Sequence, residues 1–386
     1  MRRKELVAYA VAFVGPLAGN AVLALLGTFQ REWGISPSTV LLSIPAFMFP
    51  FAFMQLFSGT ISDAYDRRNT IVYGLSLYSI GGFLAALSPS FGFFMGTRLL
   101  QGIGYAFVQP VLLALLSEIS GKERLGLVMG YYGSSTTAGV ALGPLLAGLL
   151  AELNWRWTFV LIGLLGITVL LAMLALYSRS GQQEAGVKPG AIRRQLASTL
   201  RRRDVVLLSS SGFAAFVSFV GVVSFVSEEL GSGHLQLGPS EIGIALSVNG
   251  FSGMAFSPFS GRLVDTRGAR ISTSIGFVLA ALSTLLLAFE HDRYWLFIVA
   301  LAIQGAGTSY VWAALLTMSV RAHPELRGTA SSVFNSSRFF GYAMAPVILS
   351  PVFVISGFAW VMAICASLCA VALVLVLSSA RTLDRG

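Results

Sequence analysis

Twelve long apolar runs follow one another along the chain and leave room for little else. Each is about 20 residues or longer, which is the length a helix needs to cross a hydrocarbon layer of roughly 30 Å. A transmembrane β-barrel would instead show alternating segments of about ten residues. The runs therefore predict an all-α integral membrane protein with twelve transmembrane helices. They lie near residues 6–29, 38–60, 69–88, 92–117, 125–151, 156–178, 204–227, 240–260, 271–289, 293–319, 328–352 and 356–379.

The charged residues fix how these helices are oriented. They make up only 11% of the 386 residues, against roughly a quarter in a soluble domain. With the N-terminus inside, 21 of the 26 basic residues fall in the inner segments, which is the positive-inside distribution. We therefore expect both termini in the cytoplasm and a multi-pass protein of the plasma (cytoplasmic) membrane, the inner membrane of a cell that has two. The net charge of +9 is a topology signal, and we expect no nucleic-acid partner.

The chain repeats itself at an offset of 202 residues, which places Gly59 on Gly261 and Asp63 on Asp265. Ser38 and Ser240 also coincide, and each is expected to cap the helix that follows. Six spans per half give two parallel halves, an architecture typical of transporters that handle substrate near the midplane between the halves. The predicted parts are an N-terminal bundle, a polar cytoplasmic linker and a C-terminal bundle, at residues 1–178, 179–203 and 204–386.

Two charge clusters repeat with the halves: GTISDAYDRR at 59–68 and GRLVDTRGAR at 261–270. Asp63 and Asp265 are expected at the cytoplasmic ends of helices, where an acid accepts hydrogen bonds from helix N-termini or pairs with an arginine. Such contacts exist only while the cytoplasmic ends are together, so they would stabilise an outward-open conformation. The alternative is that the arginines only anchor the topology and the acids are incidental.

These clusters resemble the cytoplasmic loop signature of the major facilitator superfamily, G-x-x-x-D-x-x-G-x-R/K. The first copy departs from the signature at Asp66, where the family has glycine, whereas the second copy has Gly268. In the family this loop gates the conformational change. The resemblance implies the same role for Gly59, Asp63, Arg67, Arg68, Gly261, Asp265 and Arg270.

A second motif, RLLQGIG, begins at Arg98 in the fourth span. An arginine within hydrocarbon costs several kcal/mol unless it faces a wet cavity or a partner, so Arg98 is expected to point inward. The motif is similar to R-x-x-Q-G-x-G of the same family, where the arginine serves proton transfer or substrate binding. The alternative is a side chain that snorkels to the outer interface.

The fifth span carries glycines at 130, 139, 143 and 148, with Pro144 after Gly143. Glycines allow close helix approach and proline bends a helix, so this span suits a hinge between the halves. The pattern resembles the antiporter motif of the family's drug and metabolite exporters. The resemblance implies gating roles for Gly139, Gly143 and Pro144, and helix packing is the alternative.

The expected cavity has cations and few acids. Arg98 and Arg338 are the charges predicted deep within spans, and Asn20 stands where some exporters of the family carry an acid. Glu228 and Glu229 lie at the outer end of the seventh span, and whether either reaches the cavity is left open. The pattern favours an anionic or neutral, hydrogen-bonding substrate. The residues predicted to bind it are Asn20, Arg98, Gln101, Tyr105, Gln304, Asn335 and Arg338.

The function predicted from all of this is secondary, proton-coupled export of small organic molecules, as in multidrug efflux, by alternating access. The same fold also serves organic-anion exchangers, uniporters and uptake symporters, and these remain alternatives. A membrane receptor or enzyme is a remote one, because the sequence shows no metal-ligand cluster, catalytic triad or P-loop. We expect a monomer in the lipid bilayer, with protons and a small molecule as partners and without cofactor or metal.

Overall fold

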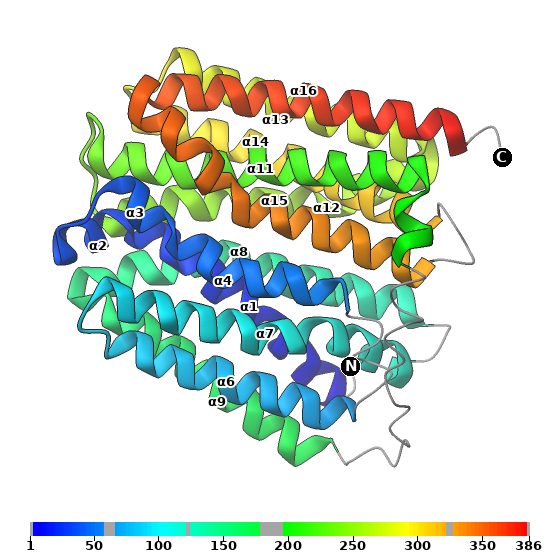
Figure 1. Ribbon diagram of the computed structural model, residues 1–386, viewed down its shortest axis with the longest axis horizontal. Helices are drawn as coiled ribbons and strands as arrows, with labels where there is room; N and C mark the ends of the chain where they lie inside the picture. The colour runs from blue at the N-terminus through cyan, green and yellow to red at the C-terminus, as the bar shows by residue number, and fades with distance from the viewer. Residues whose placement is uncertain (1–2, 58–65, 121–123, 178–195, 322–326, 384–386) are drawn as a thin grey trace.

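The computed structural model describes residues 3–57, 66–120, 124–177, 196–321 and 327–383, and all regular structure in these ranges is helical. The predicted all-α fold is confirmed. The long helices lie side by side along the long axis of the molecule (Figure 1). α1 begins and α16 ends at the right-hand end of this view, while α2 and α3 lie at the left. Following the predicted topology, we call these the inner and outer ends.

The described part of the first half is helical almost throughout. The first predicted span is interrupted by a 3-10 turn and continues as a second helix, and the second span begins with a short separate helix. The bounds are α1 Arg3–Ala21, η1 Val22–Leu25, α2 Leu26–Trp33, α3 Pro37–Leu41, α4 Ser43–Gln55, α6 Arg67–Ala86, α7 Phe91–Ser120, α8 Leu125–Asn154 and α9 Arg156–Leu176.

The second half has longer and less interrupted helices. Several extend past the apolar runs, because polar residues at the membrane boundary continue the helical turns. The bounds are α11 Arg203–Ser232, α12 Pro239–Arg267, α13 Ala269–Phe289, α14 Tyr294–Arg321, α15 Arg327–Ser356 and α16 Phe358–Leu383. The division at residues 178 and 204 stays a prediction.

Eleven helices in the described ranges are long and apolar enough to cross a membrane. The one predicted span that is not among these eleven lies near 69–88 and corresponds to the helix α6. This helix is 20 residues long, but it is less apolar than the other eleven. Its sequence, RRNTIVYGLSLYSIGGFLAA, mixes glycine, serine and tyrosine with the aliphatic residues. Helix formation at this position is therefore as predicted.

The predicted serine caps are wrong by two residues. The N-cap of α3 is Ser36, whose hydroxyl accepts a hydrogen bond from the Thr39 amide at 3.3 Å. The N-cap of α12 is Gly238, and Ser240 lies inside the first turn. The reason is the proline between them, since proline has no N–H to donate and is favoured at the first helical position.

The two halves use the same glycine contacts. A β-carbon added at Gly74 of α6 would lie 2.6 Å from the carbonyl oxygen of Gly104 in α7. At Gly276 of α13 it would lie 2.6 Å from the carbonyl oxygen of Gly307 in α14. Helix backbones approach this closely only where side chains are absent. The repeat seen in the sequence therefore corresponds to a repeated packing arrangement.

Candidate functional site

Arg98 is fully buried near the centre of the first half. Its Nη1 donates hydrogen bonds to the Ala18 carbonyl oxygen at 3.2 Å and to Gln101 Oε1 at 2.9 Å. The guanidinium lies 4.5 Å from the ring centroid of Phe47, close enough for a cation–π contact. The arginine thus points inward, and the snorkelling alternative is wrong. Its Nε and Nη2 have no hydrogen-bond partner.

Asn20 joins the two halves at the same depth. Its side chain accepts a hydrogen bond from the Tyr342 hydroxyl of α15 at 3.0 Å, and its Nδ2 donates to the Pro16 carbonyl oxygen at 2.8 Å. Arg98 binds the Ala18 carbonyl oxygen, two residues before Asn20 in α1. The Asn20–Tyr342 bond therefore ties α1 to α15 beside the buried arginine.

Tyr105 has a role that the sequence did not indicate. Its hydroxyl donates to the Ala12 carbonyl oxygen of α1 at 3.2 Å. This is the carbonyl that Pro16 leaves without a partner, because proline has no N–H to donate four residues back. Tyr105 therefore supports the bend of α1 and lies at the edge of the site.

Arg338 is held in an aromatic cage. Its guanidinium carbon lies 3.7 Å from the ring centroid of Trp312, 4.0 Å from that of Phe339 and 5.1 Å from that of Phe216. Its Nε donates to Asn335 Oδ1 at 2.9 Å. Aromatic faces attract a cation and leave most of its N–H groups available for a ligand.

Phe51 of α4 lies between Tyr105 and the aromatic cage of Arg338. Its ring centroid lies 5.8 Å from that of Tyr105 and 4.5 Å from that of Phe339. Six of the seven predicted binding residues thus belong to a centre formed by α1, α4, α7 and α15. Gln304 does not: it is fully buried, and neither of its amide atoms has a hydrogen-bond partner.

This centre is positively charged. In the described part of the chain the ion pairs are Arg67–Glu118, Arg124–Glu5 and Arg156–Glu32, so no described carboxylate pairs with Arg98 or Arg338. The prediction of buried cations without a buried acidic partner therefore matches their placement. Their role in binding stays a prediction.

Glu228 is the buried acid that sequence analysis left open. It is 1% exposed and accepts hydrogen bonds from Gln30 Nε2 at 2.7 Å and from the Ser232 hydroxyl at 2.8 Å. Gln30 belongs to α2 of the first half, so this contact also spans the halves, here at the outer end. Next to it, the Ser227 hydroxyl donates to the Leu23 carbonyl oxygen.

The seam between α8 and α12 is closed at its outer end and open at its inner end. Gly148 packs against the Pro239 carbonyl, and Gly250 packs against Ala141. Gly130 lies 18 residues before Gly148, which is five helical turns, and so faces the same way. A β-carbon at Gly130 would nevertheless have no heavy atom within 4 Å.

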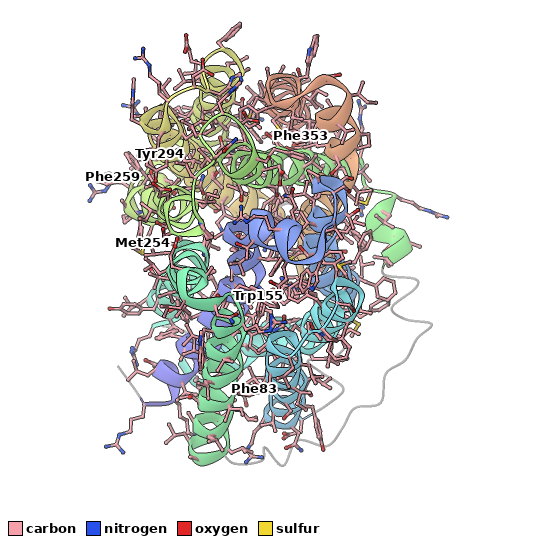
Figure 2. All side chains as sticks on the ribbon, turned by 90° about the vertical axis from the view of Figure 1, so that its left-hand side faces the viewer. Phe83, Trp155, Met254, Phe259, Tyr294 and Phe353 are labelled. Carbon is pink, nitrogen blue, oxygen red and sulfur yellow. The ribbon has the colours of Figure 1, made fainter. Side chains whose placement is uncertain are left out.

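Helix α12 likewise has a packed glycine near its outer end and an open one near its inner end. Gly243 packs against the Pro144 carbonyl, whereas Gly261, again 18 residues further on, has open space around it. Met254 and Phe259 of this inner part are 37% and 61% exposed. Figure 2, which views the outer face, shows both at the margin of the bundle. The α8–α12 seam is therefore open towards the inner end.

The expected hinge glycines face another way. A β-carbon at Gly143 would lie 2.5 Å from the Leu17 carbonyl oxygen, and Gly139 packs against that of Phe13. Both contacts join α8 to α1 within the first half, while Pro144 faces α12. The glycines thus serve close packing inside one half, and their action as a hinge stays a prediction.

Gly59 and Asp63 lie outside the described residues. The neighbouring arginines bind within their own half: Arg67 pairs with Glu118 of α7, and Arg68 donates to the Leu174 carbonyl oxygen of α9 at 3.3 Å. Asp66 accepts a hydrogen bond from the Asn69 amide at 2.8 Å and caps α6. Asp66, the residue at which this loop departs from the signature, therefore serves as the N-cap of α6.

In the second copy, Gly268 ends α12 with φ +88°, a conformation that favours glycine. Asp265 is exposed and forms no ion pair with any residue that the structure describes. Arg270 begins α13. In the second copy the signature glycine therefore forms the turn between α12 and α13.

Several residues of the site were missed. Tyr342 stands four residues after Arg338, on neighbouring turns of one helix, and this spacing could have revealed it. Gln55 donates to Gln109 at 2.8 Å between α4 and α7, and only its polarity within an apolar run marks it. Gln30 gives no such signal, because its partner is 198 residues away.

Comparison with known proteins agrees with this fold. The family model described as Major Facilitator Superfamily matches residues 8–238 and 205–384. The quinolone resistance protein NorA of Staphylococcus aureus (strain COL) is 23% identical over 385 residues, 97% of each chain. The MFS-type transporter Rv1250 of Mycobacterium tuberculosis is 21% identical over 86% of this chain and 67% of its own length.

Solved structures give the same result at lower identity. A POT family transporter in complex with a thioalcohol-conjugated peptide has a TM-score of 0.80 at 14% identity, and covers 98% of this chain and 96% of its own. Another, in complex with 5-aminolevulinic acid, has a TM-score of 0.79 at 13% identity and covers 99% and 97%. At this identity the likeness concerns the fold.

Proposed function

The chain belongs to the major facilitator superfamily, and from this premise we propose that it exports small organic molecules in exchange for protons by alternating access. A multi-pass transporter of this family binds small-molecule substrates within the membrane. The resemblance to quinolone resistance proteins over nearly the whole chain supports export of drug-like compounds. In this proposal the protein acts as a monomer, without chemical catalysis, and residues 1–178 and 204–386 move against each other.

The observation that carries the proposal is the buried contact between Glu228 and Gln30. It joins the halves at the outer end, and the hydrogen bonds described for the carboxyl come from neutral side chains, Gln30 and Ser232. Burying an ionised carboxylate without a cation is costly. A protonated Glu228 therefore suits the closed outer end, and an ionised one suits an outer end that is open to water.

This arrangement couples proton and substrate movement. In the outward-open state Glu228 takes up a proton from outside, and closure of the outer seam then buries the neutral carboxyl. Loss of the proton towards the inside and binding of substrate at the central arginines return the protein to the outward-open state. Each cycle thereby exchanges protons for substrate.

Transport into proteoliposomes tests this exchange. A fluorescent quinolone is followed under an imposed pH difference, for wild type and for Glu228→Gln and Glu229→Gln. We expect Glu228→Gln to abolish pH-driven movement, because the amide imitates the protonated carboxyl and cannot lose a proton. Glu229→Gln, the adjacent control, should retain most of the rate. Undiminished pH-driven transport by Glu228→Gln would refute the coupling role.

The two buried arginines support a second candidate. Arg98 and Arg338 lack carboxylate partners among the described residues, and two guanidinium nitrogens of Arg98 have no hydrogen-bond partner. An organic anion would complete both sites. An exchanger, uniporter or symporter for organic anions would therefore move a carboxylate compound equally well without a pH difference. The exporter requires that difference.

A further inference from the structure

A second contact surface between the halves, the α4–α15 seam, differs from the α8–α12 seam. Its inner part is closed: the Ser336 hydroxyl donates to the Ala52 carbonyl oxygen at 2.8 Å, and Leu56 packs against the buried cluster of Val205, Ala330 and Val333. Its outer part holds a groove of about 410 Å³. Residues of the groove include Leu42, Pro346, Val347, Ser350, Val354 and Ile355.

The groove opens sideways, at the level of the outer leaflet. Val354 and Ile355 are 65% and 83% exposed and lie at the end of α15. Because they are apolar and the helix spans the membrane, their exposed surface faces lipid. A molecule in the groove therefore has direct access to the outer half of the bilayer.

Ser350 gives the groove a polar recognition point. The residue is 8% exposed, and its hydroxyl is buried without a hydrogen-bond partner. Several serine hydroxyls in the spans donate to a carbonyl one turn back, as Ser76 does to Val72 at 2.8 Å, whereas the buried hydroxyls of Ser209 and Ser224 in α11 share the unpartnered state of Ser350. An unpartnered buried hydroxyl costs about 1–3 kcal/mol, which a ligand can recover.

One carbonyl near this hydroxyl lacks its usual helical donor. Pro351 has no N–H to donate to the carbonyl of Val347, four residues back in α15. Val347 and Pro351 both line the groove, as do Ser38 and Thr39. The groove therefore combines an apolar wall with hydroxyl and carbonyl groups that accept a hydrogen bond from a ligand.

The groove and the central site lie on the same helix, α15. Arg338, Tyr342, Pro346, Ser350 and Val354 follow at steps of four residues. Each step turns by about 40° around the helix, so this row winds from the face of α15 that holds Arg338 towards the face that holds Val354. Pro346 and Ser350 therefore lie along α15 between the caged arginine and the mouth of the groove.

We propose that the groove binds an amphiphilic solute, with an apolar body and at least one hydrogen-bond donor, as it passes from the central site to the outer leaflet. The inference rests on the proposed export function, to which it adds a substrate class and an exit route. The volume fits a drug-sized molecule. A hydrocarbon chain alone would fill the groove but leave the hydroxyl of Ser350 unpartnered.

Binding of N-phenyl-1-naphthylamine tests the proposal. This dye has two apolar ring systems and one N–H donor, and its fluorescence rises in apolar sites. Binding is measured with the full chain in phosphatidylcholine nanodiscs, at one pH on both faces, after subtraction of empty discs. We expect Ser350→Ala to weaken binding about two- to tenfold, since one hydrogen bond is lost. Val354→Trp, which fills the mouth, should abolish it.

Matched controls lie on α16, outside the groove. Ser367→Ala removes an exposed hydroxyl, and Val374→Trp enlarges a residue that is 62% exposed. Both should bind the dye as wild type does. Equal binding by Ser350→Ala, Val354→Trp and these controls would overturn the proposal. So would displacement of the dye by equimolar phosphatidylglycerol, because the groove would then be a lipid site.

The dye-binding experiment tests the groove independently of the export function. Dye binding uses no pH difference, whereas export is measured by pH-driven quinolone transport. Normal groove binding without pH-driven transport would refute the export proposal alone. Intact pH-driven transport with a groove that binds no dye would refute only the exit route.

Discussion

Replacing Gly250 by alanine is expected to force the outer ends of α8 and α12 apart. The added β-carbon would lie 2.5 Å from Ala141 Cα and 2.6 Å from its Cβ, whereas ordinary contact begins at 3.4 Å. The two backbones must therefore separate by about 0.9 Å. Overpacking of this kind costs about 1–3 kcal/mol. Because the strain exists only while the seam is closed, the closed-to-open ratio should fall about 5- to 150-fold.

The assay is a distance measurement between nitroxide labels on the outer ends of the halves. Leu153 of α8 and Phe289 of α13 are suitable positions, since they are 81% and 82% exposed. The native Cys365 and Cys369 are buried, so cysteines introduced at the two positions take the labels. Gly250→Ala should increase the fraction of long outer distances.

The matched control is Gly130→Ala. Gly130 lies eleven residues before Ala141, about three helical turns, and so faces the same way along α8. It has no heavy atom within 4 Å of an added β-carbon, and alanine favours the helix equally at both sites. An outer distance in Gly250→Ala that matches wild type would refute the reasoning. A shift of the same size in Gly130→Ala would do so too.

Three further outcomes are expected. Arg98→Ala and Arg338→Ala should each weaken the binding of a quinolone about tenfold or more, and the binding of its uncharged ester much less. Thermal shift measures both affinities. Equal losses of affinity for the two compounds would contradict an anion-binding role. Arg67→Gln should change the free energy of unfolding by less than about 1 kcal/mol, because its ion pair is partly exposed, and a larger loss in thermal unfolding would show a stronger structural role. Tyr342→Phe removes a hydrogen bond between the halves that is worth about 1 kcal/mol, so it should raise the fraction of long distances between the outer labels. Tyr105→Phe removes a hydrogen bond within one half and should leave that fraction unchanged.

The helices could be predicted because each span must satisfy its own backbone hydrogen bonds in the membrane. An apolar run of about 20 residues therefore has essentially one solution. The predictions that were wrong, those of the serine N-caps and of an unbroken first span, depend on single residues at helix ends. Pro37 moved the N-cap from Ser38 to Ser36, and the first span broke at η1, where Leu25 has φ −107° and ψ 0°.

The candidate site was predictable where burial alone decides. A charged side chain in the middle of an apolar run must turn inward, and Arg98 does so. The contacts across the halves were not predictable, because they depend on which ends of the helices touch. Glu228 and Gln30 belong to different halves and meet at the outer end. Likewise, no pattern indicated that Arg67 would pair with Glu118 of its own half.

The central claim is that the two ends of the molecule open in alternation. Paired label distances test it most directly, with Leu153 and Phe289 for the outer end, and Leu127 of α8 and Phe259 of α12, 56% and 61% exposed, for the inner end. The distances are recorded in nanodiscs while quinolone is added and the pH is raised. The account predicts that the outer distance lengthens as the inner one shortens. Distances that stay fixed, or that lengthen at both ends together, would contradict it.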